Sequence, residues 1–308
     1  MSNDIVNLIS TKDISRNKKT RSGKERAFLG GRYVALIFLT FFAISPIYIM
    51  VVNSFKGITS VSQSGAWGFP THLNFAAWPP VWDNLKGSMA RTLFFVVQSS
   101  IISAIIGSIN GYVFAKWRFR GSNFIFTTFL FGMFIPYQAI MIPLTQFNHA
   151  VGLTGSIYVL VFAHVVYGIP ICTLIFRNYY AAIPTEIIEA GRVDGAGMVK
   201  IFRTIILPLS APAFVVVLIW QFTSAWNDFL FAIFLTGGSP KLSVATTALN
   251  FITGSGNQVY YGNNMTASLI VSIPTLLVYM FLGRYFLRGM LRSEEHTSEL
   301  QSHSFISY

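Results

Sequence analysis

The stretch EAGRVDGAG, from Glu189 to Gly197, indicates the fold of this chain more directly than any other segment. Between Lys86 and Leu291 the chain has only four carboxylates, and three of them lie in this stretch or just before it: Glu186, Glu189 and Asp194. The fourth is Asp228. Because charged groups are costly in lipid, we expect this glycine-rich segment to face water or another protein.

The composition of the chain indicates a membrane protein. Of its 308 residues, 53% are hydrophobic and only 11% are charged, whereas a soluble domain has about 25% charged residues. The single cysteine, Cys172, lies in an apolar run and excludes a disulfide framework. We expect Cys172 to pack as a small core residue.

Six apolar segments are long enough to cross a bilayer, which takes about 20 residues in a helix. Lipid-exposed backbone must satisfy its hydrogen bonds internally, so each segment is expected to be helical. The sequence therefore predicts an all-α membrane protein with six transmembrane helices. The predicted segments are residues 33–52, 93–115, 124–144, 156–175, 209–235 and 267–287.

The basic residues predict how these spans are oriented. If the N-terminus lies inside, eighteen of the 22 Lys and Arg residues fall on the cytoplasmic side. Cytoplasmic loops of membrane proteins carry such an excess, so both termini are predicted to be cytoplasmic, in a plasma (inner) membrane. The net charge of +11 is then a topology signal, and nucleic acid is not expected as a partner.

The chain divides into three predicted regions. Residues 1–32 form a basic cytoplasmic tail, and residues 33–291 form the transmembrane domain with a long inner loop at 177–207. The last region, RSEEHTSELQSHSFISY at 292–308, turns hydrophilic directly after a span and looks like the translation of a sequencing-adapter oligonucleotide. We therefore expect residues 292–308 to be non-native, which leaves the true C-terminus after Leu291 open.

No motif of catalysis or metal binding occurs in the sequence. A G-x-x-x-x-G-K-[ST] phosphate loop, an H-E-x-x-H helix, a G-x-S-x-G turn and paired cysteines are all missing. The chain is therefore predicted not to be an enzyme, and to bind neither a metal nor a cofactor itself.

The inner loop is predicted to contain two short helices. Pro184 can occupy the first helical position, and Glu186 and Glu189 then fall in the first turns, where the helix dipole favours negative charge. Glu189 and Arg192 are spaced to form an ion pair. The glycines should end this helix near Asp194 and Gly195.

A second amphipathic stretch follows, with apolar residues at helical spacing, and Pro208 is expected to end it as the chain re-enters the membrane. Two interpretations of the loop stay open on these grounds. It is either a capped helix lying on the membrane surface or a docking site for another protein.

The loop closely resembles the E-A-A-x-x-x-D-G-A…L-P signature of inner-membrane permeases in binding-protein-dependent ABC importers. The gap before the aspartate is one residue shorter here, and Gly191 stands where the family usually has a second Ala. The stretches FAKWRFRG, SAWNDFLFA and PTLLVYMFLGRYFLRG extend the resemblance to the carbohydrate branch, the maltose-type second permease. The matching positions are Glu189, Ala190, Gly191, Asp194, Gly195, Ala196, Phe202, Leu207 and Pro208.

The resemblance implies a type I ABC importer permease fold whose loop, Glu186 and Arg192 included, forms a coupling helix seated in an ATPase. It further implies a second permease, identical or similar, two ATPase subunits that bind ATP and Mg²⁺, and an extracytoplasmic solute-binding protein. The chain would then form half of the translocation path for a sugar, and ATP hydrolysis would occur on the separate ATPase. The likeness of the last span implies a glucose- or mannose-type substrate.

Four residues are predicted to line the translocation path. Asp228 and its neighbour Asn227 lie near the outer end of the fifth span, and intramembrane acids usually face the interior of a bundle. Asp228 could equally be an interfacial carboxylate beside Trp226. His164 and Ser103 are included, although both residue types also serve simply to pack helices.

Two other classes of protein stay open as alternatives. A secondary transporter would need intramembrane ionisable relays and inverted repeats, of which the sequence gives little sign. A membrane anchor without transport would leave the loop unexplained. Within the ABC class, an amino acid or phosphate could replace the sugar, and the sequence does not identify the sugar or its contacts.

Overall fold

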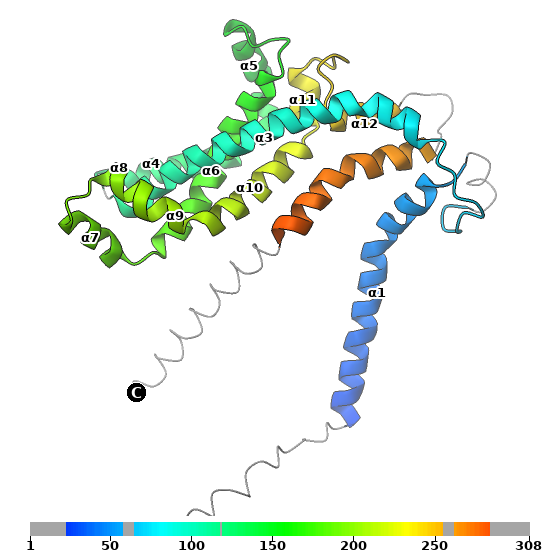
Figure 1. The fold of residues 1–308 in the computed structure, drawn as a ribbon, viewed down its shortest axis with the longest axis horizontal. Coiled ribbons are helices and arrows are strands. Elements are labelled where there is room, and N and C mark those ends of the chain that lie inside the picture. Colours follow the sequence, from blue (N-terminus) through cyan, green and yellow to red (C-terminus); the bar gives the residue numbers. More distant parts are fainter. Residues whose placement is uncertain (1–22, 58–64, 118, 255–261, 284–308) are drawn as a thin grey trace, which may run out of the picture. The chain divides into compact units, whose positions relative to one another are not determined.

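The computed structural model of the chain describes residues 23–57, 65–117, 119–254 and 262–283. These residues divide into two units at Ile49, and helix α1, Gly23–Ser54, crosses the boundary between them (Figure 1). Most of the predicted basic tail and the whole of 292–308 lie outside the described residues, as do the last residues of the predicted sixth span.

The described part of the first unit, Met1–Ile49, is the segment of α1 from Gly23 to Ile49. Residues Phe28–Ser54 of this helix are long and apolar enough to cross a membrane, which agrees with the predicted first span at 33–52. Phe38, Phe41 and Phe42 are more than half exposed, as expected for a helix that faces lipid or another chain.

The second unit is built around three helices that lie side by side: α3 (Trp78–Lys116), α6 (Tyr158–Ala181) and α10 (Ala211–Trp226) (Figure 1). Glycines let α3 and α6 approach closely. A Cβ at Gly107 would lie 2.5 Å from Cβ of Cys172, and one at Gly111 would lie 2.6 Å from Cβ of Phe176. Small residues at such contacts are a common packing device between membrane helices. Cys172 is buried here, as predicted.

The predicted third span is broken. Helix α4 (Ser122–Phe131) and the short 3₁₀ helix Gly132–Phe134 meet α5 (Tyr137–Ala150) at an angle of 97°. Pro136 stands between them with extended backbone and leaves Ile135 extended too, because proline disfavours helical geometry in the preceding residue. The span predicted over 124–144 therefore consists of two helices with a bend between them.

The predicted fifth span is also interrupted. Helix α10 ends at Trp226, and α11 (Leu230–Leu235) begins after three residues that include Asp228. The chain then forms α12 (Ala245–Gly254) and, after residues that are not described, the helix Gly262–Gly283. In the part of the chain that the structure describes, four helices are long and apolar enough to cross a membrane, or up to six if each bent pair is one span, and this upper count equals the predicted six.

The inner loop forms its own group of short helices at one end of the unit (Figure 1). These are α7 (Thr185–Val193), α8 (Met198–Ile201), a π-helix at Phe202–Ile206 and α9 (Leu207–Leu209). The α8–α9 segment meets α10 at 76°. Helices α11 and α12 lie toward the other end of α3.

Candidate functional site

Helix α7 ends in a Schellman motif at the predicted glycine break. Gly195 has φ +75°, in the left-handed region that favours glycine. Its N–H donates to the carbonyl of Arg192 at 3.0 Å, and the N–H of Ala196 donates to the carbonyl of Gly191 at 2.9 Å. These two bonds define the motif, with Asp194 as the C-cap residue. The sequence Asp194-Gly195-Ala196 therefore ends the helix.

The start of α7 lies one residue later than predicted. Pro184 is the N-cap, with ψ 136°, and the helix begins at Thr185. Glu186 is in the first turn, where its charge complements the helix dipole. Glu186, Glu189 and Ala190 are all exposed, so the acids face away from the bundle.

The predicted ion pair between Glu189 and Arg192 is not among the ion pairs of the described residues. Arg192 instead places its guanidinium 4.4 Å from the centre of the Trp117 ring, just after the end of α3. An exposed ion pair on a helix gains little free energy in water, whereas a half-buried indole offers the cation an apolar face. Trp117 was not among the predicted site residues.

The buried side of α7 fits closely against the rest of the loop. Ile188 and Gly191 face inward, and a Cβ at Gly191 would lie 3.2 Å from Cδ1 of Ile205 and 3.4 Å from Cγ1 of Ile201. The position of Gly191 is thus already filled by two isoleucine side chains.

The second half of the loop follows the predicted apolar face, with one addition. Ile201 and Ile206 are fully buried, and Met198, Phe202 and Ile205 pack against the same cluster. The π-helix adds one residue to the turn, which brings Ile206 onto the buried side. The prediction that Pro208 ends this helix was wrong, because Leu207–Leu209 stays helical and the bend follows at Ser210. Proline is tolerated in a first turn, which explains its place in α9.

The exposed face of the loop is a mixed apolar and acidic surface. Val193 is 87% exposed and Val199 is 62% exposed, and Ile187 is exposed as well. The acids Glu186, Glu189 and Asp194, which are close to Ile187 and Val193 in the sequence, are exposed as well. Apolar side chains rimmed by charge are typical of a surface that binds another protein.

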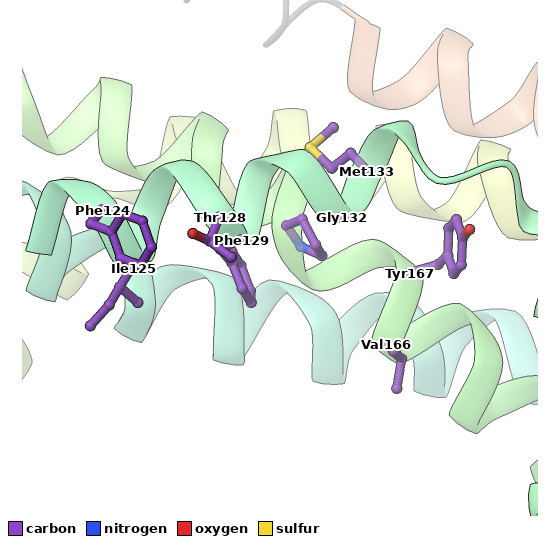
Figure 2. A pocket seen from close by; sticks show the side chains of 9 residues that line it. Phe124, Ile125, Thr128, Phe129, Gly132, Met133, Val166 and Tyr167 are labelled. Atoms are coloured by element: carbon purple, nitrogen blue, oxygen red, sulfur yellow. The ribbon is translucent and has the colours of Figure 1, made fainter.

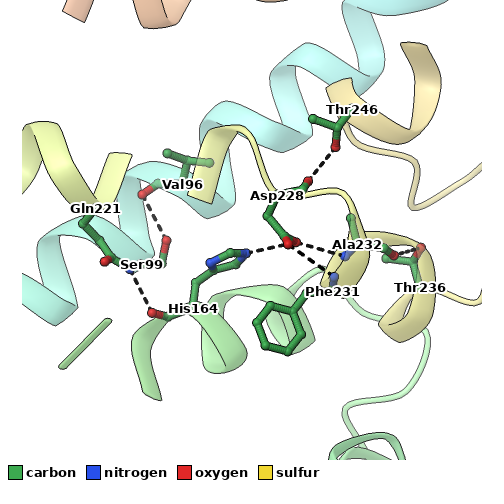
Figure 3. A network of polar contacts seen from close by, with 9 residues as sticks. All are labelled: Val96, Ser99, His164, Gln221, Asp228, Phe231, Ala232, Thr236 and Thr246. Carbon is green, nitrogen blue, oxygen red and sulfur yellow. Dashed lines mark hydrogen bonds and ion pairs between the residues drawn. The ribbon is translucent and has the colours of Figure 1, made fainter. Parts of the chain in front are cut away.

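A second candidate site lies at the break between α10 and α11. Asp228 accepts hydrogen bonds from the N–H groups of Phe231 (3.3 Å) and Ala232 (3.2 Å), and so caps the start of α11 (Figure 3). Thr246 of α12 donates its hydroxyl to the backbone carbonyl of Asp228 at 2.7 Å. The carboxylate is 13% exposed, so its charge is held inside the protein.

His164 of α6 faces this carboxylate. Its Nε2 lies 3.4 Å from Oδ2 of Asp228, without the geometry of a hydrogen bond. The imidazole stacks on Phe95, with ring centres 5.5 Å apart, and meets the edge of Phe231 at 5.7 Å. The structure therefore brings together two residues that are 64 positions apart in the sequence and that were both predicted for the path.

His164 and Asp228 line a cavity of about 470 Å³. Asn227 also lines it, together with aromatic residues from four helices, α5, α6, α10 and α11, and further polar groups. Ser103, the fourth residue predicted for the path, is not part of this lining, and its hydroxyl lies 3.5 Å from the carbonyl of Val165, between α3 and α6. The other lining residues are Tyr137, Tyr167, Gly168, Ile171, Trp220, Gln221, Ser224, Phe229, Leu230 and Phe231.

A cavity of similar size, about 500 Å³, lies between α4 and α6 (Figure 2). Its lining has no charged side chain and includes Phe124 and Phe129, Ile125 and Val166. Phe124 is 76% exposed, as expected for a lipid-facing groove. A polar solute would find few hydrogen-bond partners there, so the cavity beside Asp228 is the better candidate for a path. Within the described ranges, no three His, Cys, Asp or Glu side chains come together as metal ligands.

The comparisons with known proteins agree on one family. Residues 100–292 match the model of the family described as "Binding-protein-dependent transport system inner membrane component". The chain is 32% identical over 289 residues to the xylose/arabinose import permease protein of Haloferax volcanii, covering 85% of this chain and 92% of that protein. It is 40% identical over 265 residues to a probable ABC transporter permease protein of Pyrococcus horikoshii (83% and 93% covered). It is 31% identical over 266 residues to the glucose import system permease protein of Saccharolobus solfataricus (84% and 92% covered).

Among solved structures, the chain resembles one in the crystal structure of a bacterial ABC transporter involved in the import of the acidic polysaccharide alginate. The TM-score is 0.76 at 23% identity, and the match covers 86% of this chain and 99% of that one. This likeness confirms the predicted type I ABC importer permease fold. The chain therefore belongs to the inner membrane components of binding-protein-dependent transport systems, as the multi-pass permease of an ABC importer whose ATPase is a separate subunit.

Proposed function

We propose that the chain forms half of the translocation path of a sugar importer and that its 184–208 loop couples this path to a partner ATPase. The observation that supports the coupling role is that α7 has two different faces. One face, with Ile188 and Gly191, is buried, and the other exposes acids among apolar residues. A rigid, two-sided helix at the end of a membrane bundle can pass force from a soluble partner to the spans.

The proposed coupling residues divide into two groups by their place in the loop. Glu186, Glu189, Ala190 and Asp194 belong to the exposed face, whereas the others shape the loop or anchor it. The second group consists of Gly191, Arg192, Gly195, Ala196, Phe202, Leu207 and Pro208.

The proposed complex contains this chain, a second permease that is identical or similar, two ATPase subunits and an extracytoplasmic solute-binding protein. ATP and Mg²⁺ would be bound by the ATPases, and both termini of this chain would be cytoplasmic, on the side of α7. The excess of basic residues on that side supports this orientation.

The proposed substrate class is a sugar. Two of the relatives reported above are import permeases for xylose/arabinose and for glucose. The cavity beside Asp228 suits such a solute, because aromatic rings can stack on a sugar face while the polar groups of Asn227 and Gln221 reach hydroxyls. His164, Asn227 and Asp228 are the proposed path residues.

The complex provides the test. The chain would be co-expressed with a candidate ATPase, second permease and solute-binding protein, sought among the genes beside its own, and reconstituted in proteoliposomes. We expect a binding protein loaded with xylose, arabinose or glucose to stimulate ATP hydrolysis and sugar uptake, and Asp194→Arg to abolish both while the subunit still inserts. Normal stimulation in Asp194→Arg would contradict docking through α7. Stimulation by an amino acid or phosphate, and by no sugar, would contradict the sugar assignment.

Orientation has a separate test. A cysteine introduced as Ser10→Cys should react with a membrane-impermeant maleimide in inverted vesicles and not in intact cells. Labelling in intact cells would place the N-terminus outside and overturn the proposed topology.

A further inference from the structure

The C-terminal end of α3 holds the loop at both of its helices. Lys116 donates its ammonium to the carbonyl of Ile183, just before α7, at 2.5 Å. Trp117 lies under the guanidinium of Arg192, in the last turn of α7, at 4.4 Å. The hydroxyl of Tyr112 donates to the carbonyl of Met198, at the start of α8, at 3.2 Å. Apart from the covalent joins to α6 and α9, these contacts tie the loop to a helix distant in sequence.

Tyr112 connects these contacts to each other. Its side chain is only 1% exposed, and its ring meets the Trp117 ring edge-on at 6.3 Å and the Phe202 ring at 5.2 Å. Trp117 is therefore fixed on one side by Tyr112 and holds Arg192 on the other. Because a buried tyrosine with its hydroxyl bonded has little freedom, the indole face has a defined orientation.

The opposite part of α3 contacts the segment beside the cavity. Arg91 donates to the carbonyl of Ser243 at 2.8 Å, and the hydroxyl of Thr92 accepts the N–H of Ala245, the first residue of α12, at 2.7 Å. Thr246, the next residue, donates its hydroxyl to the backbone carbonyl of Asp228. From Thr92 to Lys116 the helix rises by roughly 36 Å at ~1.5 Å per residue. One continuous helix thus links the coupling loop to the cavity.

We propose that Trp117 is a positioning residue that fastens the coupling helix to α3, so that displacement of α7 moves α3 and, through α12, the backbone at Asp228. The inference rests on the proposed function, since it assumes that α7 receives the motion of an ATPase. It assigns a role to an aromatic residue outside the Glu189–Pro208 signature. Trp117 acts through Arg192 and touches no solute.

The test compares two substitutions of Trp117 in the reconstituted complex. Trp117→Leu keeps apolar bulk but removes the ring face, whereas Trp117→Phe keeps a ring. We expect Trp117→Leu to lower uptake per ATP hydrolysed by about fivefold, the scale of a modest coupling between sites, while ATPase subunits stay bound and basal hydrolysis is unchanged. Trp117→Phe should restore most of the coupling. A merely structural role would instead lower assembly or thermal stability in step with uptake.

A double-mutant cycle supplies the matched control. Arg192→Gln should uncouple about as strongly as Trp117→Leu, and the two together should cost no more than either one, because they remove the same contact. Arg177 makes a similar contact with Phe126, at 4.2 Å, but it joins α6 to α4 and not to α7 or α8. Phe126→Leu should therefore keep uptake per ATP near wild type and combine additively with Arg192→Gln.

The outcomes separate this inference from the proposed function. If Asp194→Arg uncouples while Trp117→Leu couples normally, the loop docks as proposed and the role of Trp117 is wrong. Additive losses for Trp117→Leu and Arg192→Gln would also overturn it. If the wild-type complex shows no solute-stimulated hydrolysis at all, the proposed function itself fails.

Discussion

Nε2 of His164 lies 3.4 Å from Oδ2 of Asp228, and the two side chains are 6% and 13% exposed. The same carboxylate caps the start of α11 and also lines a cavity. It therefore has two separable roles, one in the local structure and one in the cavity. Each task responds to a different substitution.

Asp228→Asn is expected to separate these two tasks. The amide oxygen can still accept one N–H of α11, so the thermal midpoint of the purified complex should stay close to that of wild type. Uptake should fall several-fold, because the negative charge beside the cavity is gone. Asp228→Ala should additionally lose about 1 kcal/mol of stability with the cap. A thermal melt and an uptake assay on both variants check this, and wild-type uptake in Asp228→Asn would contradict a path role.

Position 195 should tolerate no side chain, whereas the nearby position 197 should tolerate one. At φ +75° an L-residue is strained by about 1–2 kcal/mol, and Gly195→Val would open the Schellman motif. Gly197 has φ −74° and open space around its Cα, so Gly197→Ala is a matched control two residues away. We expect Gly195→Val to reduce solute-stimulated ATP hydrolysis about fivefold or more, and Gly197→Ala to leave it near wild type. Equal rates in the two variants would show that the turn does not position α7.

Gly191→Ala is expected to preserve transport. The added methyl group would meet Cδ1 of Ile205 at 3.2 Å, and a terminal methyl can move by the few tenths of an ångström required. Alanine also gains about 1 kcal/mol of helix propensity over glycine. The thermal midpoint should therefore hold or rise, with stimulation intact. Gly191→Leu should lose solute-stimulated ATP hydrolysis because its side chain overpacks the site. An equal loss in Gly191→Ala would show that the packing around Gly191 cannot accommodate even one added methyl group.

Gly111→Val should prevent the second unit from folding. Its branched side chain would collide with Cβ of Phe176 and with the backbone N of Arg177, which a Cβ alone would approach to 2.6 and 2.8 Å. Backbone cannot move aside as a side chain does, so we expect loss of detergent-stable protein by size-exclusion chromatography. Gly31→Val, where nothing lies within 4 Å, is the control and should give normal yields.

The sequence predicted the architecture well because both of its main signals are local. Runs of about 20 apolar residues require helices in lipid, and a glycine directly after a helical segment, such as Gly195, is typical of a helix C-terminus. The breaks at Pro136 and around Asp228 were harder to predict, since mean hydropathy does not distinguish a straight span from a bent one. A proline and an acid inside apolar runs were the signals available for them.

The partner of Arg192 could not be predicted from spacing along the helix. Glu189 is close in sequence, but the preference for Trp117 depends on how α3 packs, 75 positions earlier in the chain. The cluster KWRFRG at the end of a predicted span does combine aromatic and basic residues, and it was the one sequence signal for this contact. The pairing of His164 with Asp228 is likewise a product of packing.

The turn that closes α7 also bears on how this protein ages chemically. Asp-Gly peptides isomerise when the glycine amide nitrogen attacks the aspartate carboxyl group and forms a succinimide. In this turn the N–H of Gly195 is bonded to the carbonyl of Arg192 at 3.0 Å, and the backbone is fixed in the left-handed region. Because this hydrogen bond engages the N–H whose proton must leave before the nitrogen attacks, the intact turn is expected to slow the reaction. A subunit whose loop is frayed should accumulate isoaspartate at position 194 first, at the surface where one altered residue would do the most harm.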